Sequence, residues 1–323
     1  MRFALVGGLV ALGAFLLVSA VASLACAGLW VALRARGGDP KRGARVLFNL
    51  RMLPTALSVV VVLGLVVPAY LRFEPREAAE TLGAGLPLLA IAAGILIARG
   101  MLRLARAWRA TEGLGSEWMR RAERIDLAGA PLPAYRIAHS FPVVSVLGFA
   151  HPRLFVAGQV LESLTAAELG AVLEHETAHL AARDNLRGLL MRSSPDWLSL
   201  TALGPRLERE WAEASEAAAD DHAVRARPGS AVDLAAALLK VARLAPAGAR
   251  LLPAASALHD GGSVAYRVAR LAAGLAVAPG ATRARGSTWL LGALIVIVAV
   301  SSQSSTVLQA VHRLSETIVH FLG

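Results

Sequence analysis

The stretch from Leu173 to Leu180 contains the pattern His-Glu-x-x-His, formed by His175, Glu176 and His179. Two histidines four residues apart on a helix project from the same face, where their imidazoles can bind one zinc ion. The glutamate between them can act as a general base toward a water molecule on that ion. This spacing predicts a zinc-dependent hydrolase, against the alternative that both histidines merely face solvent.

The residues before the pattern predict the helix that it needs. Thr165 and Glu168 form the capping-box sequence Thr-Ala-Ala-Glu. Apolar residues then recur at helical spacing from Leu169 to Leu180. We therefore expect a helix over residues 165–183 that forms without help from a metal.

A catalytic zinc ion takes three protein ligands and leaves one position for water, so a third ligand is needed. The chain has one cysteine, Cys26, which excludes an internal disulfide and a cysteine-based zinc site. The remaining ligand types are histidine and carboxylate. A second predicted helix, from Pro205 through Ala223, is rich in carboxylates: Glu208, Glu210, Glu213, Glu216, Asp220 and Asp221.

These carboxylates are not equivalent. We interpret Glu208 and Glu210 as part of a solvated face, which is the usual role of clustered acids. Glu216-Ala-Ala-Ala-Asp220 puts two carboxylates on one face, and the small alanines allow close packing against the His175 helix. An inward carboxylate at Glu216 would then need a cation. Glu213, one turn away, remains the alternative ligand.

The composition predicts a membrane protein. The chain has 323 residues, of which 56% are hydrophobic and only 5% aromatic, and this is too apolar for an ordinary soluble protein. The formal net charge is +10. No basic–aromatic interleaving or nucleic-acid motif accompanies the arginines, so we expect no nucleic-acid partner. The arginines flank apolar runs, which favours the lipid bilayer as the partner.

We expect about four transmembrane helices: residues 3–33, 52–71, 82–102 and about 289–308. The fourth turns polar after Val300. A basic loop over residues 34–51 and arginines from Arg99 to Arg109 indicate cytoplasmic sides, and an acidic loop over residues 72–81 indicates the outside. The predicted N-terminus is therefore outside.

Three regions follow from these spans: a membrane region over residues 1–104, a cytoplasmic zinc-peptidase domain over 105–286, and the fourth span with a short tail over 287–323. After a helical lead-in, β-formers at residues 135–141, 143–147 and 154–156 predict a small sheet. Two further helices are expected over residues 232–244 and 264–275. The predicted fold class is a mainly α membrane protein with an α+β peptidase domain.

The motifs together resemble a known family. The segment from His175 to Asp184, preceded by Gly148–Val156 and followed by Glu216-Ala-Ala-Ala-Asp220 and Arg267–Leu271, is similar to the BlaR/MecR-type integral-membrane zinc peptidases. These are antirepressor proteases of the gluzincin type, associated with β-lactam sensing. The resemblance covers roughly residues 50 to 275.

The resemblance implies that His175, His179 and Glu216 bind zinc, that Glu176 is the general base, and that Asp220 orients a ligand from behind. A donor to the oxyanion should also exist; His222 and Tyr266 are candidates, although each type is more often structural. Arg183 and Asp184 would either brace the helix or form an ordinary polar helix end. Family members carry a penicillin-binding domain after the fourth span. The chain ends at Gly323, so we expect a separate sensor protein or the membrane itself to supply the signal.

The sequence thus predicts a zinc metalloendopeptidase in a bacterial-type inner membrane that hydrolyses a cytoplasmic protein, by family analogy a transcriptional repressor. One alternative is a quality-control protease similar to the heat-shock membrane peptidases related to prenyl-protein proteases. Another is a non-catalytic signalling scaffold with a structural metal. The intact Glu176 argues against a scaffold, because a structural site needs no base.

Overall fold

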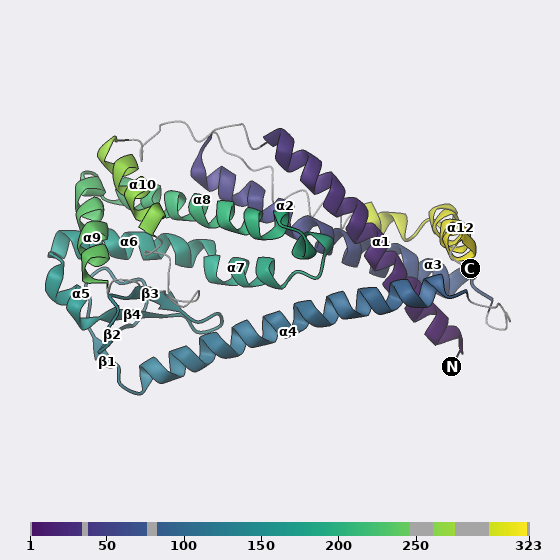
Figure 1. Cartoon of the computed structure of the whole chain (residues 1–323), viewed down its shortest axis with the longest axis horizontal. Coiled ribbons are helices and arrows are strands. Elements are labelled where there is room, and N and C mark those ends of the chain that lie inside the picture. The colour runs from purple at the N-terminus through teal and green to yellow at the C-terminus, as the bar shows by residue number, and fades with distance from the viewer. Residues whose placement is uncertain (1, 34–37, 76–82, 246–260, 275–296, 322–323) are drawn as a thin grey trace.

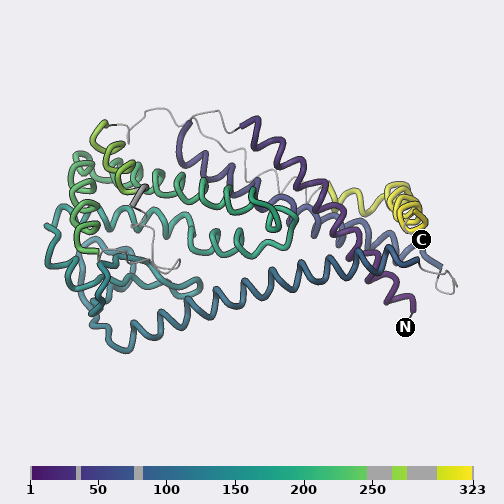
Figure 2. Tube along the Cα trace, in the orientation of Figure 1, coloured from purple at the N-terminus to yellow at the C-terminus, as the bar shows by residue number. Residues whose placement is uncertain are grey.

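The computed structural model describes residues 2–33, 38–75, 83–245, 261–274 and 297–321. The molecule is elongated, with a small sheet and its helices at one end and the N-terminus beside the C-terminal helix at the other (Figure 1). Figure 2 shows that one long helix, α4, runs between the two ends. The shape separates a mixed-polarity domain from a bundle of apolar helices.

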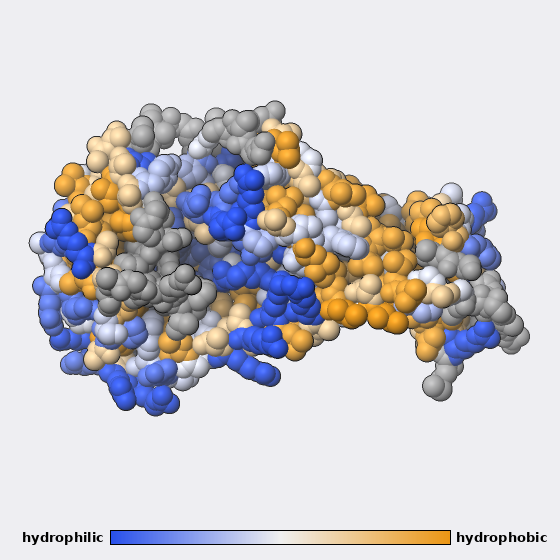
Figure 3. Space-filling model, viewed as in Figure 1, coloured by the Kyte–Doolittle hydropathy of each residue, from blue (hydrophilic) through white to orange (hydrophobic). Residues whose placement is uncertain are grey.

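Three helices within the described residues are long and apolar enough to cross a membrane. They are α1 (Arg2–Leu33), the continuous helix Pro40–Phe73, and α4 (Gly85–Met119). The second consists of α2 (Pro40–Val61), a π-helical turn η1 (Val62–Val66) and α3 (Val67–Phe73). Figure 3 shows apolar residues gathered around this part of the molecule and hydrophilic ones around the sheet end. The first three predicted spans are thus present as helices.

Two helix boundaries differ from the prediction. The segment over residues 34–51 was expected to be a loop, but α2 begins at Pro40, and the Asp39 side chain caps it by accepting from the Arg42 N–H at 3.3 Å. Proline is favoured in the first turn of a helix, because the backbone N–H that it lacks would have no partner within the helix there. Helix α4 likewise continues far beyond residue 102, to Met119. Both helices therefore extend out of the apolar stretch toward the sheet domain.

The predicted fourth span lies mostly outside the described residues. Residues 297–301 are helical, and the polar stretch that follows interrupts the helix before α12 (Ser305–Phe321) begins. Val298 packs against Gly64 of the π-helical turn so closely that a side chain at Gly64 would collide with it. This described end of the apolar run therefore contacts the second membrane helix.

A mixed four-stranded sheet forms the base of the other end, with strand order β1-β2-β4-β3. The strands are β1 (Glu123–Ile125), β2 (Ala134–Ile137), β3 (Val144–Leu147) and β4 (Arg153–Ala157). β2 and β4 are parallel, and the two outer pairs are antiparallel. The three predicted strands are present, the first shorter than expected. The short β1 was missed because it lies within the expected helical lead-in.

Six helices follow the sheet in the described part of this domain. They are α5 (Gly158–Ser163), α6 (Ala166–Ala182), α7 (Asp184–Ser193), α8 (Leu203–Ala226), α9 (Ser230–Leu244) and α10 (Gly261–Ala272). The first two of them, α5 and α6, contact its strands. The predicted capping box is present: the Thr165 hydroxyl accepts from the Glu168 N–H, and the Glu168 carboxylate accepts from the Thr165 N–H. Helix α6 packs along α8 and α9. The metal-binding pattern is therefore carried by a helix in the middle of the domain.

Helix α8 also packs along α2, and this contact corrects one expectation. Glu208 was interpreted as solvated, but its carboxylate accepts from Arg51 Nε of α2 at 3.1 Å. Glu210, also expected in solvent, accepts from Trp30 Nε1 of α1 at 2.9 Å. Charged groups of α8 thus join the domain to the apolar helices, because a helix that lies in such an interface presents two faces to protein.

Candidate metal centre

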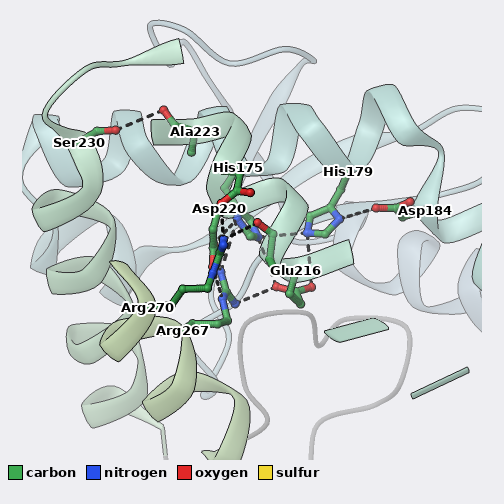
Figure 4. Close-up of polar contacts among 11 residues, drawn as sticks. His175, His179, Asp184, Glu216, Asp220, Ala223, Ser230, Arg267 and Arg270 are labelled. Atoms are coloured by element: carbon green, nitrogen blue, oxygen red, sulfur yellow. Dashed lines mark hydrogen bonds and ion pairs between the residues drawn. The ribbon is translucent and has the colours of Figure 1, made fainter. Parts of the chain in front are cut away.

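Helix α6 brings the two histidines of the motif together in the domain interior. His175 is fully buried, and His179, one turn later, is slightly exposed at the wall of a cleft. Their Nε2 atoms lie 3.1 Å apart. Both imidazoles therefore aim one ring nitrogen at the same point (Figure 4).

Helix α8 supplies the third donor. The Glu216 carboxylate lies 3.5 Å from His175 Nε2 and 3.4 Å from His179 Nε2. Zinc bonds of about 2.0–2.1 Å at tetrahedral angles require donor atoms about 3.3 Å apart. His175 Nε2 is near Glu216 Oε2 and His179 Nε2 is near Glu216 Oε1, each at about that spacing, and one ligand atom of each residue lies within 4.8 Å of the others. The residues therefore fit a zinc ion. Glu213, the alternative, is exposed on the same helix.

Each imidazole has a carboxylate behind it. His175 Nδ1 lies 3.0 Å from Asp220 Oδ1, and His179 Nδ1 lies 2.8 Å from Asp184 Oδ2. A carboxylate at Nδ1 fixes the tautomer that carries its proton there and leaves Nε2 free to bind a metal. Asp184 also accepts from the Ser215 hydroxyl of α8. Asp184 was expected either to brace the helix or to form an ordinary polar helix end, and these contacts support the first alternative.

A left-handed residue makes the Asp184 contact geometrically possible. Arg183 ends α6 with φ 54°, the only positive φ at a non-glycine among the described residues. Helix α7 begins at once after this residue, with Asp184 in its first turn. Residues other than glycine seldom adopt this backbone conformation, because it is strained. Such strain is often found at functional sites.

Arg267 of α10 was not assigned a role from the sequence, yet it completes the site. Its guanidinium binds Asp220 through Nε at 2.9 Å and Nη2 at 2.6 Å, and its Nη1 lies 2.8 Å from Glu216 Oε2. Figure 4 shows this side chain reaching both carboxylates from α10. Arg270, one turn along, binds Asp221 and the Ala217 carbonyl. The segment Arg267–Leu271 is one of the motifs on which the family resemblance rests, but the sequence assigned no role to its arginines.

These charges shift the pKa values of the site. Burial acts to lower the pKa of His175, but hydrogen bonds with Asp220 and Glu216 outweigh it and raise the value to about 9. Burial acts to raise the pKa of Asp220, but its bonds with His175 and Arg267 hold it well below the ordinary range. The site therefore favours positive charge between its carboxylates, as a cation-binding site must.

Glu176 faces a cleft beside the three donors. Its Oε2 accepts from the Val146 N–H of edge strand β3 at 3.3 Å, and the Val146 carbonyl accepts from Asn185 at 2.7 Å. Burial raises the pKa of Glu176, opposed by the neighbouring histidines. A raised pKa makes a carboxylate a stronger base near neutral pH. Glu176, His179 and Glu216 line one cleft of ≈ 570 Å³ together with β3, α7 and α8.

The two candidate oxyanion donors lie elsewhere. Tyr266 is 65% exposed on α10, and His222 is half-buried on α8, two residues beyond Asp220. Neither His222 nor Tyr266 is among the described residues that line the cleft. The structure thus brings together five of the seven predicted site residues and leaves these two outside.

Comparison with known proteins gives one similarity, and it falls on this domain. Residues 120–273 match Peptidase family M48. The match does not confirm the BlaR/MecR subtype suggested by the motifs. No curated protein matches the chain. The M48 match begins just after α4 and spans the sheet, both histidines, Glu216 and Arg267. Residues 120–273 are therefore similar to the metallopeptidases of family M48, and they follow helices that are long and apolar enough to cross a membrane.

Proposed function

We propose that this protein is a zinc-dependent endopeptidase that hydrolyses peptide bonds of a cytoplasmic protein at the membrane. The observation that carries the proposal is the convergence of His175, His179 and Glu216 beside the carboxylate of Glu176: the two Nε2 atoms lie 3.1 Å apart, and each lies 3.4–3.5 Å from an oxygen of Glu216. A buried carboxylate that is not a ligand but adjoins three ligands has a natural role as a base.

Zinc bound by His175, His179 and Glu216 would supply a Lewis acid that polarises a peptide carbonyl and acidifies a water molecule. Glu176 accepts the proton of that water as its oxygen bonds to the carbonyl carbon. The same carboxyl then donates the proton to the leaving amine as the C–N bond breaks. The Val146 N–H holds the carboxylate in position, and the raised pKa of Glu176 suits a group that must take and return one proton.

The cleft fits an extended polypeptide as the substrate. Its walls come from edge strand β3 and the loop Gly148–Pro152 on one side, and from α7 and α8 on the other. The arginines that flank the apolar helices support a cytoplasmic location for this domain. A protein segment near the inner surface of the membrane is therefore the proposed substrate.

The decisive experiment compares Glu176→Ala with Glu174→Ala in the full chain purified in detergent. Glu174 is a partly exposed carboxylate two residues away on the same helix, so it is a matched control. We expect Glu176→Ala to retain zinc and to lower cleavage of an unfolded protein substrate about 10²- to 10⁴-fold, the usual contribution of a general base. Glu174→Ala should cleave like the wild type. Equal cleavage by Glu176→Ala and wild type would rule out the proposed mechanism.

A further inference from the structure

A second group of metal-ligating side chains lies at the end of the molecule opposite the metal centre. Glu74 follows directly after α3, and His312 and Glu316 lie one turn apart on α12. Figure 1 shows α12 beside α3, far from α6. The contact therefore joins the end of the second membrane helix to the C-terminal helix.

The donor atoms of this group converge. His312 Nε2 lies 3.2 Å from Glu316 Oε1 and 3.9 Å from Glu74 Oε2, and one ligand atom from each residue lies within 4.8 Å of the others. The side chains of Glu74 and His312 are only 15% and 13% exposed, whereas that of Glu316 is 47% exposed. Two donors are thus held in place, and the third is free to adjust around an ion.

Packing around the group keeps it in this arrangement. The Phe73 ring lies 6.0 Å from the His312 ring, centre to centre. Val311 and Val319 of α12 pack against Val66 and Tyr70 of the second helix. The apolar face of α12 is therefore seated on α3 and fixes which side carries His312.

The donors border a small cavity with room for a water-sized occupant. Its volume is ≈ 30 Å³, above the 10–15 Å³ that a single water or similar occupant needs. The lining includes Glu74, His312, Glu316 and also His320. His312, Glu316 and His320 are spaced four residues apart, so they follow one face of α12. His320 thus adds a second imidazole to the lining of this cavity.

We propose that Glu74, His312 and Glu316 form a second metal site, for a divalent transition-metal ion such as Zn²⁺ or Ni²⁺, that fastens α12 to the second membrane helix. One imidazole with two carboxylates is a donor set that such ions accept, and the two carboxylates balance the charge of the ion. An ordinary His–Glu ion pair would need only one of the two carboxylates. On the orientation predicted from the sequence, the ion would bind from the side opposite the peptidase domain.

The test is the metal content of the full chain in detergent, after chelation and dialysis against Zn²⁺ or Ni²⁺. We expect His312→Ala and Glu316→Gln each to hold one ion fewer per chain than the wild type. Glu316→Gln keeps the size of a half-exposed side chain and should leave the fold intact. Thr317→Ala is the matched control, because the Thr317 hydroxyl donates to the Arg313 carbonyl of its own helix. This variant should hold as much metal as the wild type.

Hydrogen exchange gives a second readout. Added Zn²⁺ should slow exchange of α12 amides in the wild type and in Thr317→Ala, but not in Glu316→Gln. Retention of the ion by Glu316→Gln, or by His312→Ala, would overturn the site. The test compares the number of bound ions per chain in each variant with that in the wild type. Its outcome therefore does not depend on whether the site at His175 binds zinc or whether the protein cleaves a substrate. Both variants should retain the wild-type peptidase activity, because neither residue is near the cleft.

Discussion

Asp184 and Asp220 each contact one histidine of the candidate metal centre, and they come from different helices. Asp184 follows His179 by five residues through the turn at Arg183, whereas Asp220 comes from α8 and is itself held by Arg267. Each carboxylate accepts a hydrogen bond from the Nδ1–H of its histidine and so directs Nε2 toward the shared point. The geometry of the three donors thus depends on residues that do not touch the ion.

Removing Asp184 should therefore weaken metal binding without removing a ligand. We expect Asp184→Asn to lower zinc affinity about 10- to 100-fold, because the amide cannot hold the imidazole as firmly. Titration with a competing chelator measures this change. Asp126→Asn, at an exposed position, is the control and should bind zinc like the wild type. An unchanged affinity in Asp184→Asn would mean that packing alone orients His179.

Glu216 and Glu213 provide a direct test of the third ligand. Glu216 is 8% exposed and lies 3.4 Å from His179, whereas Glu213 is exposed one turn earlier. We expect Glu216→Ala to lose most bound zinc, since two protein ligands hold the ion far less tightly than three. Glu213→Ala should keep full zinc occupancy by elemental analysis. The reverse pattern would move the ligand by one turn of α8.

At the scale of elements, α8 connects the candidate metal centre to the long apolar helices. Glu216 lies in its second half, and Glu208 in its first half binds Arg51 of α2. Arg51 is fully buried and also binds Asp196 at 2.7 Å, and Thr55 donates to the same carboxylate at 2.9 Å. Burial raises the pKa of Asp196 although Arg51 acts to lower it. The ion pair is therefore a desolvated charge pair between the peptidase domain and α2.

Breaking this pair should destabilise the whole protein. We expect Arg51→Met to cost about 3–5 kcal/mol of unfolding free energy, because it leaves Asp196 buried without its cation. Thermal unfolding in detergent measures the loss, with Lys41→Ala, at an exposed position of α2, as the control. The double variant Arg51→Met with Asp196→Asn should recover part of the stability, since the second change removes the unpaired charge. No difference between single and double variants would contradict this account.

At the scale of the whole molecule, apolar helices separate two polar ends. The peptidase domain lies at one end, and Glu74 with α12 lies at the other (Figure 1). Exposed apolar side chains such as Leu24, Leu63 and Ile95 cover the helices between them. Such a surface is stable only against lipid or another apolar partner. The two candidate metal sites would then face opposite sides of one bilayer.

Reporter fusions test this orientation. A fusion at residue 45 should report a cytoplasmic location and a fusion at residue 76 an external one, because the basic residues gather near the former. Residue 76 itself lies outside the described residues. Alkaline phosphatase and fluorescent-protein fusions give opposite signals for the two sides. A cytoplasmic signal from residue 76 would reverse the orientation of both metal sites.

The sequence by itself determined the parts of the site that are local. His175, Glu176 and His179 lie within five residues, and the capping box that starts their helix lies ten residues earlier, so helical geometry alone aligns them. The candidate spans were also predictable from the sequence, because a run of about twenty apolar residues is typical of a helix in lipid. Glu216 needed only the additional inference that an alanine-rich helix packs closely.

Only the tertiary structure decided which distant residues complete the site. Arg267 binds Asp220 across 47 residues and Arg51 binds Asp196 across 145, and no local pattern marks either pair. Glu208 was interpreted as solvated because the sequence of α8 does not show which helices pack against it. In the structure α8 packs against α2, and Glu208 binds Arg51 there. Long-range charge pairing arises from how the elements pack, because burial makes each charge depend on one particular partner.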